Sequence, residues 1–296
     1  MVETTPAPAV TIPDAKLSER AMGALGKLPP FSPILNKLLA SLAGEDVSFS
    51  KLGDLIEKDT VVAGNIIHLV NSALYARRAT ITSVRHALAL LGMDKVRNTL
   101  LGMSISRMWS QVKTPAGWSM VRFNRHSAAV AILSDQIASR AQAEYPEGAF
   151  VGGLLHDLGR LLIALGLPDE FTRLMKLHEQ SDRSWTECEL ELLGFTHAEL
   201  SAAALEKWKF PQEVQLAVRD HHRIPAFPAG GIIPLSAVIH AADQYVNSTG
   251  ESIVASKLVS AEDPAPIASL GIPEEKIGPL LADFKAEHAA MAAFFK

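Results

Sequence analysis

Histidine and aspartate lie next to each other in a strongly apolar stretch of the chain. His156 and Asp157 belong to the segment VGGLLHDLGRLLIAL, which is apolar nearly all round and is expected to form a buried helix. A buried carboxylate is costly unless it is paired, hydrogen-bonded or bound to a metal. Adjacent helical residues point about 100° apart, so these two side chains need partners from other helices. A buried hydrogen bond within the pair is the plain alternative.

Two more side chains of this kind lie on apolar faces of expected helices. His126 shares a helical face with Val130 and Ile137. Asp243 shares one with Val246, so a second carboxylate faces the core. Taken singly, the first could be a hydrogen-bonded core histidine and the second an internal cap or ion pair.

Three further histidines lie at helix ends. His197 stands in the first turn of a helix opened by the capping box Thr196–Glu199, and alone it could be a solvent-exposed residue. His221 and His222 close the helix that starts near Pro211, where positive charge favours the helix end. Two adjacent charged histidines repel each other, so neutral metal ligands suit this pair better.

Taken together, the buried carboxylates and imidazoles need common partners. Imidazole and carboxylate are the usual ligands of iron, manganese, nickel or zinc. The single cysteine, Cys188, gives no thiolate cluster of the kind that holds a structural zinc. The sequence therefore predicts a divalent transition-metal site, with one or two ions.

Helices must position these residues, because helical periodicity dominates the chain and strand-like alternation is nearly absent. We expect an all-α fold with a helical N-terminal lobe and a second helical lobe that carries the metal site. The expected helices lie near 34–42, 51–59, 60–70, 84–92, 94–109, 119–140, 148–165, 168–180, 184–193, 197–209, 211–222, 233–248 and 274–295. The expected divisions are a flexible tail at 1–19, the N-terminal lobe at 20–113, the metal-site lobe at 114–250 and a C-terminal helical extension at 251–296.

Composition limits the class of protein. The chain has 296 residues, 48% of them hydrophobic, which is enough for a sizeable core. With 28 basic against 32 acidic residues and a net charge of −4, it lacks the charge of a general nucleic-acid binder. A single cysteine suits a reducing compartment, and no apolar run reaches the roughly 18 residues of a membrane span. We expect a cytoplasmic protein.

The order of these residues resembles a known superfamily. His126, then His156-Asp157, then Asp243 follow the H…HD…D arrangement of the HD superfamily of helical metal-dependent phosphohydrolases. The remaining histidines resemble the extra ligands of its two-metal branch, the HD-GYP cyclic-di-GMP phosphodiesterases, although HHRIPAFPAG stands where the GYP segment would be. The resemblance implies a bridging role for Asp157 within a set of seven metal ligands, namely His126, His156, Asp157, His197, His221, His222 and Asp243.

Longer segments resemble the HDOD family, the HD-related output domains, over about residues 20–248. The segments that carry this resemblance include LPPFSPILNKLL at 28–39, IEKDTVVAGNIIHLVNSALY at 56–75 and GFTHAELSAAALEKWKFPQEV at 194–214. The family implies an N-terminal helical lobe, an HD-like lobe and a place in bacterial signalling. Membership does not by itself imply catalysis.

Three functions are compatible with these features. The first is a signalling output domain that acts through a protein partner, with Leu28–Pro30, Asp59 and Asn71–Tyr75 as candidate docking residues. The second is a phosphohydrolase acting on a nucleotide or cyclic dinucleotide, with Asp157 and Arg160 in catalytic roles. Arg160 stands where HD-GYP proteins have a lysine that can donate a proton, which favours the first function over the second. The third is a metal-free interaction scaffold.

Overall fold

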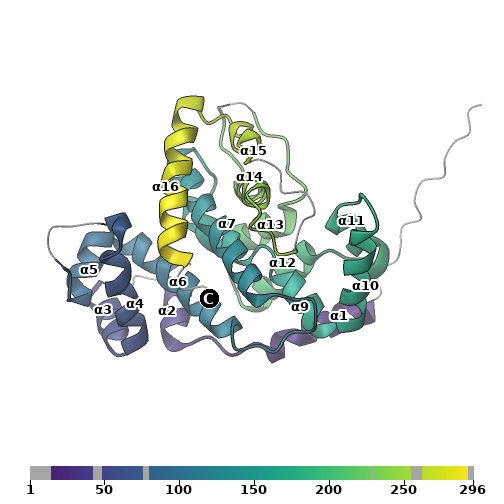
Figure 1. Ribbon diagram of the computed structural model, residues 1–296, viewed down its shortest axis with the longest axis horizontal. Coiled ribbons are helices and arrows are strands. Elements are labelled where there is room, and N and C mark those ends of the chain that lie inside the picture. Colours follow the sequence, from purple (N-terminus) through teal and green to yellow (C-terminus); the bar gives the residue numbers. More distant parts are fainter. Residues whose placement is uncertain (1–14, 43–48, 76–79, 229, 255–261, 293–296) are drawn as a thin grey trace, which may run out of the picture.

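The computed structural model describes residues 15–42, 49–75, 80–228, 230–254 and 262–292, and within them the chain is built from helices (Figure 1). In these ranges the β-structure is limited to one isolated parallel bridge between Ala143 and Ile233. The prediction of an all-α fold is confirmed.

The N-terminal helices α3, α4 and α5 gather at one end of the molecule, beside α2 and α6 (Figure 1). Asp59 starts α4 by accepting hydrogen bonds from the N–H groups of Val61 and Val62, as a cap residue should. The helices of this region are α1 (Ala15–Gly23), η1 (Ala24–Lys27), α2 (Pro33–Leu42), α3 (Phe49–Glu57), α4 (Thr60–Val70), η2 (Ala73–Tyr75), α5 (Val84–Leu91) and α6 (Met93–Trp109).

The second lobe is organised around one long helix, α7, which packs on α8, on α14 and on the C-terminal helix α16. The neighbouring helices α12 and α13 pack against each other and complete the lobe on α9 and α14. Its helices are α7 (Met120–Arg140), η3 (Pro146–Gly148), α8 (Ala149–Leu155), α9 (Leu158–Gly166), α10 (Pro168–Glu179), α11 (Trp185–Leu193), α12 (His197–Lys207), α13 (Gln212–Asp220) and α14 (Leu235–Ser248).

The prediction of one continuous helix over residues 148–165 is wrong at the centre of this segment. The helix stops after Leu155 and starts again at Leu158, with His156 and Asp157 in the turn between α8 and α9. Asp157 has φ −101° and ψ 12°, outside the helical range. The turn frees both side chains from the 100° spacing of a regular helix, so both reach the same point in the lobe.

Both ends of the described chain cross the expected division between the lobes. Residues 15–19, which the sequence placed in the tail, belong to α1, and α1 packs on α9 and α12 of the second lobe. After α15 (Ala265–Ala268), helix α16 (Glu274–Ala292) lies along α7 and also touches η2 of the N-terminal region (Figure 1). Residues 1–14 of the expected tail lie outside the described residues.

The stretch Pro146–Gly166 is long and apolar enough to cross a membrane, but 94% of its most apolar window is buried inside the protein. It comprises η3, α8 and α9, and their apolar side chains form the core of the second lobe. Burial within the fold accounts for its composition.

Candidate metal centre

The structure brings the side chains of all seven predicted ligands together. They come from α7, from the turn between α8 and α9, from the first turn of α12, from the turn that follows α13 and from α14. The helix expected over 211–222 ends at Asp220, so His221 and His222 lie just beyond it. Six of the seven are 3% exposed or less, and His222 is the half-buried one. Residues as far apart in the sequence as His126 and Asp243 therefore meet at one buried place in the fold.

The first half of the centre is formed by His126, His156, Asp243 and the Oδ2 oxygen of Asp157. His126 Nε2 lies 3.2 Å from Asp243 Oδ1 and 3.7 Å from Asp157 Oδ2. His156 Nε2 lies 3.4 Å from Asp157 Oδ2, 3.6 Å from Asp243 Oδ1 and 3.4 Å from His126 Nε2. Donors around an ion at about 2.1 Å lie about 3.4 Å apart, so the spacing of His126, His156 and Asp157, whose ligand atoms all lie within 4.8 Å of one another, suits a transition metal, and Asp243 adds a carboxylate oxygen beside the two imidazoles.

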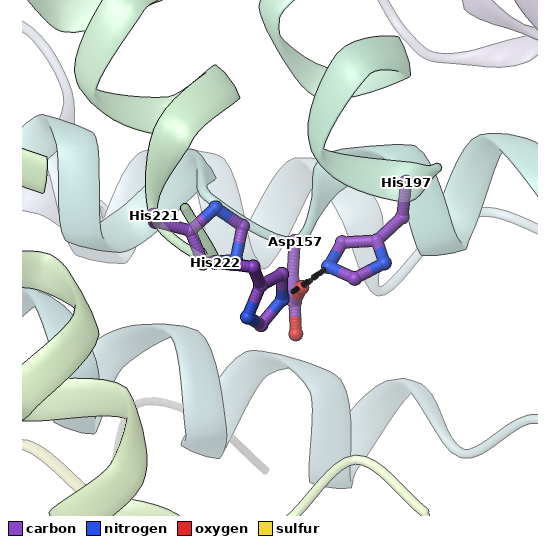
Figure 2. Close-up of side chains that lie close together, drawn as sticks. All are labelled: Asp157, His197, His221 and His222. Carbon is purple, nitrogen blue, oxygen red and sulfur yellow. Dashed lines mark hydrogen bonds and ion pairs between the residues drawn. The ribbon is translucent and has the colours of Figure 1, made fainter. Parts of the chain in front are cut away.

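The second half uses the other oxygen of Asp157, with His197, His221 and His222 arranged around it (Figure 2). His197 Nε2 lies 3.0 Å from Asp157 Oδ1 and 3.0 Å from His222 Nε2. The ligand atoms of all four residues lie within 4.8 Å of one another. Since Asp157 turns one oxygen to each half, it has the geometry of a bridging ligand.

Hydrogen bonds on the far side of each ring orient the imidazoles. The Nδ1 atoms of His126, His156 and His221 face backbone carbonyl oxygens, those of Glu251 at 2.7 Å, Gly153 at 2.8 Å and Val218 at 2.6 Å. When Nδ1 carries the proton, Nε2 keeps a free lone pair aimed at the centre, which is the usual arrangement of metal-binding histidines. His221 Nε2 is buried and has no hydrogen-bond partner in the described structure, so an ion there would satisfy it.

Glu189 of α11 orients His197 in the same way. Its carboxylate oxygens lie 2.7 and 2.9 Å from His197 Nδ1, and one of them accepts the His197 backbone N–H at 2.8 Å. Glu189 is fully buried. Glu189 was not among the residues predicted from the sequence, although it stands midway between buried Trp185 and Leu193 at four-residue spacing, which marks it as a carboxylate on a core face.

The helix that carries His197 is fixed by two other contacts. The predicted capping box is present, with Thr196 Oγ1 accepting from Glu199 N–H and the Glu199 carboxylate accepting from Thr196 N–H. Gly159 N–H donates to Ser201 Oγ at 2.7 Å, and a β-carbon on Gly159 would lie 2.0 Å from the His197 carbonyl oxygen. Helix α12 therefore approaches the start of α9 as closely as backbone atoms allow.

Neighbouring positive charges keep the Asp157 carboxylate in its anionic state. Burial alone would raise the pKa of Asp157, but Arg160 and His156 hold that pKa well below its usual value. Burial, aided by His197, lowers the pKa of His222 to about 3. Burial likewise disfavours charge on His156, yet Asp157 outweighs it and raises the pKa of His156 to about 10. A cation bound there would therefore displace a proton.

Arg160, the predicted catalytic cation, lies at the edge of the centre. Its Nε donates to Asp157 Oδ1 at 3.0 Å, and its guanidinium lies 5.5 Å from the centroid of the Trp185 ring. His240 of α14 lies beside the ligands, with Nδ1 2.9 Å from the backbone carbonyl oxygen of His221. His240 thus supports the backbone that carries two ligands.

The chain and its all-helical fold match known proteins. The family model of the HDOD domain matches residues 28–224. The chain belongs to the HDOD family. Two parts of the centre lie beyond the matched residues of this HDOD chain, namely Asp243 and the Glu251 carbonyl that orients His126.

Solved structures of similar proteins share the fold. A Geobacter sulfurreducens HDOD domain protein of unknown function superposes with a TM-score of 0.73 and 22% identity, covering 95% of this chain and 97% of that one. A Shewanella amazonensis protein described as a candidate phosphohydrolase gives 0.70 and 21%, covering 94% and 98%. A Marinobacter aquaeolei protein described as a candidate signal transduction protein gives 0.70 and 23%, covering 95% and 65%.

A curated relative from Treponema pallidum, an uncharacterized protein, is 20% identical over 224 residues. That match takes in 72% of this HDOD chain but only 41% of the relative. The relative thus contains a long region that the match does not reach.

Proposed function

We propose that this HDOD protein is a cytoplasmic signal-transduction output protein that acts by binding a protein partner, and that its HD-type metal centre holds the second lobe in its binding-competent form. One observation carries the proposal. The candidate ligands are buried, six of them at 3% exposure or less. Closed metal sites contribute to folding and shape, whereas catalytic sites keep a position open to substrate.

Iron or manganese is the expected metal, because the ligands are imidazoles and carboxylates, with nickel or zinc as alternatives. His126, His156 and Asp243 would hold one ion and His197, His221 and His222 the other, with Asp157 shared. The orphaned Nε2 of His221 and the anionic Asp157 fit such a role.

Partner binding is assigned to the N-terminal lobe, where part of the predicted docking surface has a structural use. The Asn71 side chain accepts a hydrogen bond from the Ile81 backbone N–H at 2.8 Å and donates one to the Ile81 carbonyl oxygen at 2.7 Å, which ties the end of α4 to the chain before α5. Asp59 caps α4.

Val61, on the first turn of the same helix, is 45% exposed and is free to touch a partner. Val61→Glu should abolish capture of a protein that the wild type retains, with thermal stability unchanged.

A metal-dependent phosphohydrolase acting on a nucleotide or cyclic dinucleotide is the second candidate. The observation in its favour is the shared Asp157, whose two oxygens face two ligand sets, as in sites that hold a pair of ions. Paired ions supply Lewis-acid activation of a phosphate and of an attacking water. In this chain, Arg160 would neutralise charge on the phosphate, and it would have to leave Asp157 to do so.

Elemental analysis and chelation separate these functions. Wild-type protein should carry metal that the double variant His156→Ala/Asp157→Ala lacks, and removing the metal with EDTA should lower the melting temperature by several degrees. Hydrolysis of bis-(p-nitrophenyl) phosphate should stay at the level of the variant. Hydrolysis that requires Asp157 would establish the second candidate instead. A protein without metal, whose stability ignores chelators, would leave only the metal-free scaffold.

A further inference from the structure

The two halves of the metal centre differ in the charge that they offer. The first half presents two carboxylate oxygens, Asp157 Oδ2 and Asp243 Oδ1, together with the Nε2 atoms of His126 and His156. The second half presents one carboxylate oxygen, Asp157 Oδ1, with three imidazoles. A cation in the first half therefore meets one more negative side chain directly.

Arg160 widens the difference, because its Nε–H occupies the one oxygen that the second half uses. That N–H lies 3.0 Å from Asp157 Oδ1, the same oxygen that His197 Nε2 approaches at 3.0 Å. A second cation there would meet a like charge at close range in a buried place.

Two contacts, with Trp185 and with Asp157, fix the position of the Arg160 guanidinium. It lies over the ring of Trp185, which is 8% exposed and which packs edge-on against His178 at 5.0 Å between ring centroids. Ser184, the residue before Trp185, caps α11 with a complete capping box. The cation–π contact and the ion pair with Asp157 thus fix Arg160 from both sides.

Glu189 does not cancel this effect. Its carboxylate lies behind the His197 ring at Nδ1, whereas Asp243 presents an oxygen to the centre itself. Glu189 orients His197 and makes it a better donor, but it offers no oxygen to an ion.

We infer that the centre binds two divalent cations with unequal affinity, tightly at His126, His156 and Asp243 and weakly at His197, His221 and His222, and that Arg160 is the residue that weakens the second position. The inference rests on the metal centre of the proposed function and adds an internal cation that sets its occupancy. At limiting metal, the protein carries one ion.

Titration of metal-free protein with Mn²⁺ tests this, with free Mn²⁺ counted by electron paramagnetic resonance. Wild type should bind one equivalent tightly and a second at least tenfold more weakly. Arg160→Gln should strengthen the second step at least tenfold and leave the first unchanged. Arg160→Lys keeps the charge and should retain the weak second step. Arg183→Gln, which removes an exposed arginine that pairs with Glu191 on the neighbouring α11, is the matched control and should behave as wild type.

Two ligand variants assign the halves. Asp243→Asn should lose the tight equivalent, and His222→Gln should lose only the weak one. Equal affinities in the wild type, or a second step in folded Arg160→Gln no stronger than in wild type, would overturn the inference. Binding of no Mn²⁺ by any of the proteins would instead overturn the metal centre itself, and the inference with it.

Discussion

Glu189 shows how one side chain outside the ligand set can control the centre. Its two oxygens accept both the ring N–H and the backbone N–H of His197. A neutral amide in its place has a single acceptor oxygen, so one of these donors would face another donor. The carboxylate is therefore needed both to orient the imidazole and to raise its basicity.

Replacing Glu189 by Gln should lower the affinity for the more weakly held ion by about 10- to 100-fold, which is the usual effect of losing a partner of a metal-binding histidine. Competition against a fluorescent chelator measures this. Glu191→Gln, on the exposed side of the same helix, should leave the affinity unchanged. Equal affinities in the two variants would mean that Glu189 serves only the packing of α11.

His126, His156, Asp157 and Asp243 could be predicted because each is a polar residue on an apolar helical face or segment, whereas His197, His221 and His222 were indicated mainly by the resemblance to the HD-GYP branch. Asp243 lies on an apolar helical face, and His156-Asp157 lie in an apolar segment. Glu189 carries the same mark, but its partner is eight residues away on another helix, and no spacing rule joins them. The carbonyls of Gly153, Val218 and Glu251 carry no side-chain signal at all.

At the scale of elements, the close approach of α9 and α12 fixes the position of His197. A β-carbon on Gly159 would lie 2.0 Å from the His197 carbonyl oxygen, and backbone atoms cannot move aside cheaply. Gly159→Ala should therefore push the helices apart.

We expect Gly159→Ala to reduce the free energy of unfolding by about 1–3 kcal/mol or more, as overpacking usually does. It should also weaken metal binding at the His197 position. Gly64→Ala is the matched control, because Gly64 lies in α4 with open space around it and should gain about 0.5–1 kcal/mol. Urea denaturation compares the two, and a Gly159→Ala protein as stable as wild type would contradict the packing argument.

Most helices could be placed from periodicity and caps, and the expected α4 at 60–70 agrees with the structure to the residue. The turn at His156 and Asp157 could not, because the segment has no proline and its apolar residues continue at helical spacing on both sides of this polar pair. What interrupts the helix is tertiary: Gly159 N–H bonds Ser201 on α12. Sequence periodicity reports burial, and this segment is buried on both sides of the turn.

At the scale of the whole molecule, α16 joins the two lobes through a polar cluster. Glu287 pairs with Lys95 of α6 and accepts a hydrogen bond from Gln136 of α7 at 3.0 Å. Asp135 lies beside them and accepts from Asn98 at 2.9 Å. Periodicity along the chain predicts each of these helices but not which lobe it joins, so the bridging role of α16 was not predictable.

This cluster should make stability depend on pH. Burial raises the pKa of Asp135 from 3.8 to about 6, with Lys95 opposing the shift and Glu287 adding to it. A carboxyl whose pKa is higher in the folded state stabilises the protein below pH 4 and loses that contribution as the pH rises through 6. Asp135→Asn, which stays neutral, should therefore be more stable than wild type at pH 7.5.

The advantage of Asp135→Asn should shrink as the pH falls from 7.5 to 4.5, as measured by urea denaturation across that range. A difference that does not change with pH would show that Asp135 titrates alike in the folded and unfolded chain.

The burial of the ligands has a consequence for the time scale of exchange. An ion held by His126, His156, Asp157 and Asp243, each 3% exposed or less, would be enclosed by side chains from α7, α14 and the turn after α8, so it could leave only when these elements separate. Release to a chelator would then proceed at the rate at which the lobe opens, whatever the chelator concentration, as amide protons in a core exchange with solvent. An ion acquired during folding would stay for as long as the lobe remains closed, so the protein would preserve a record of the metal available when it was made.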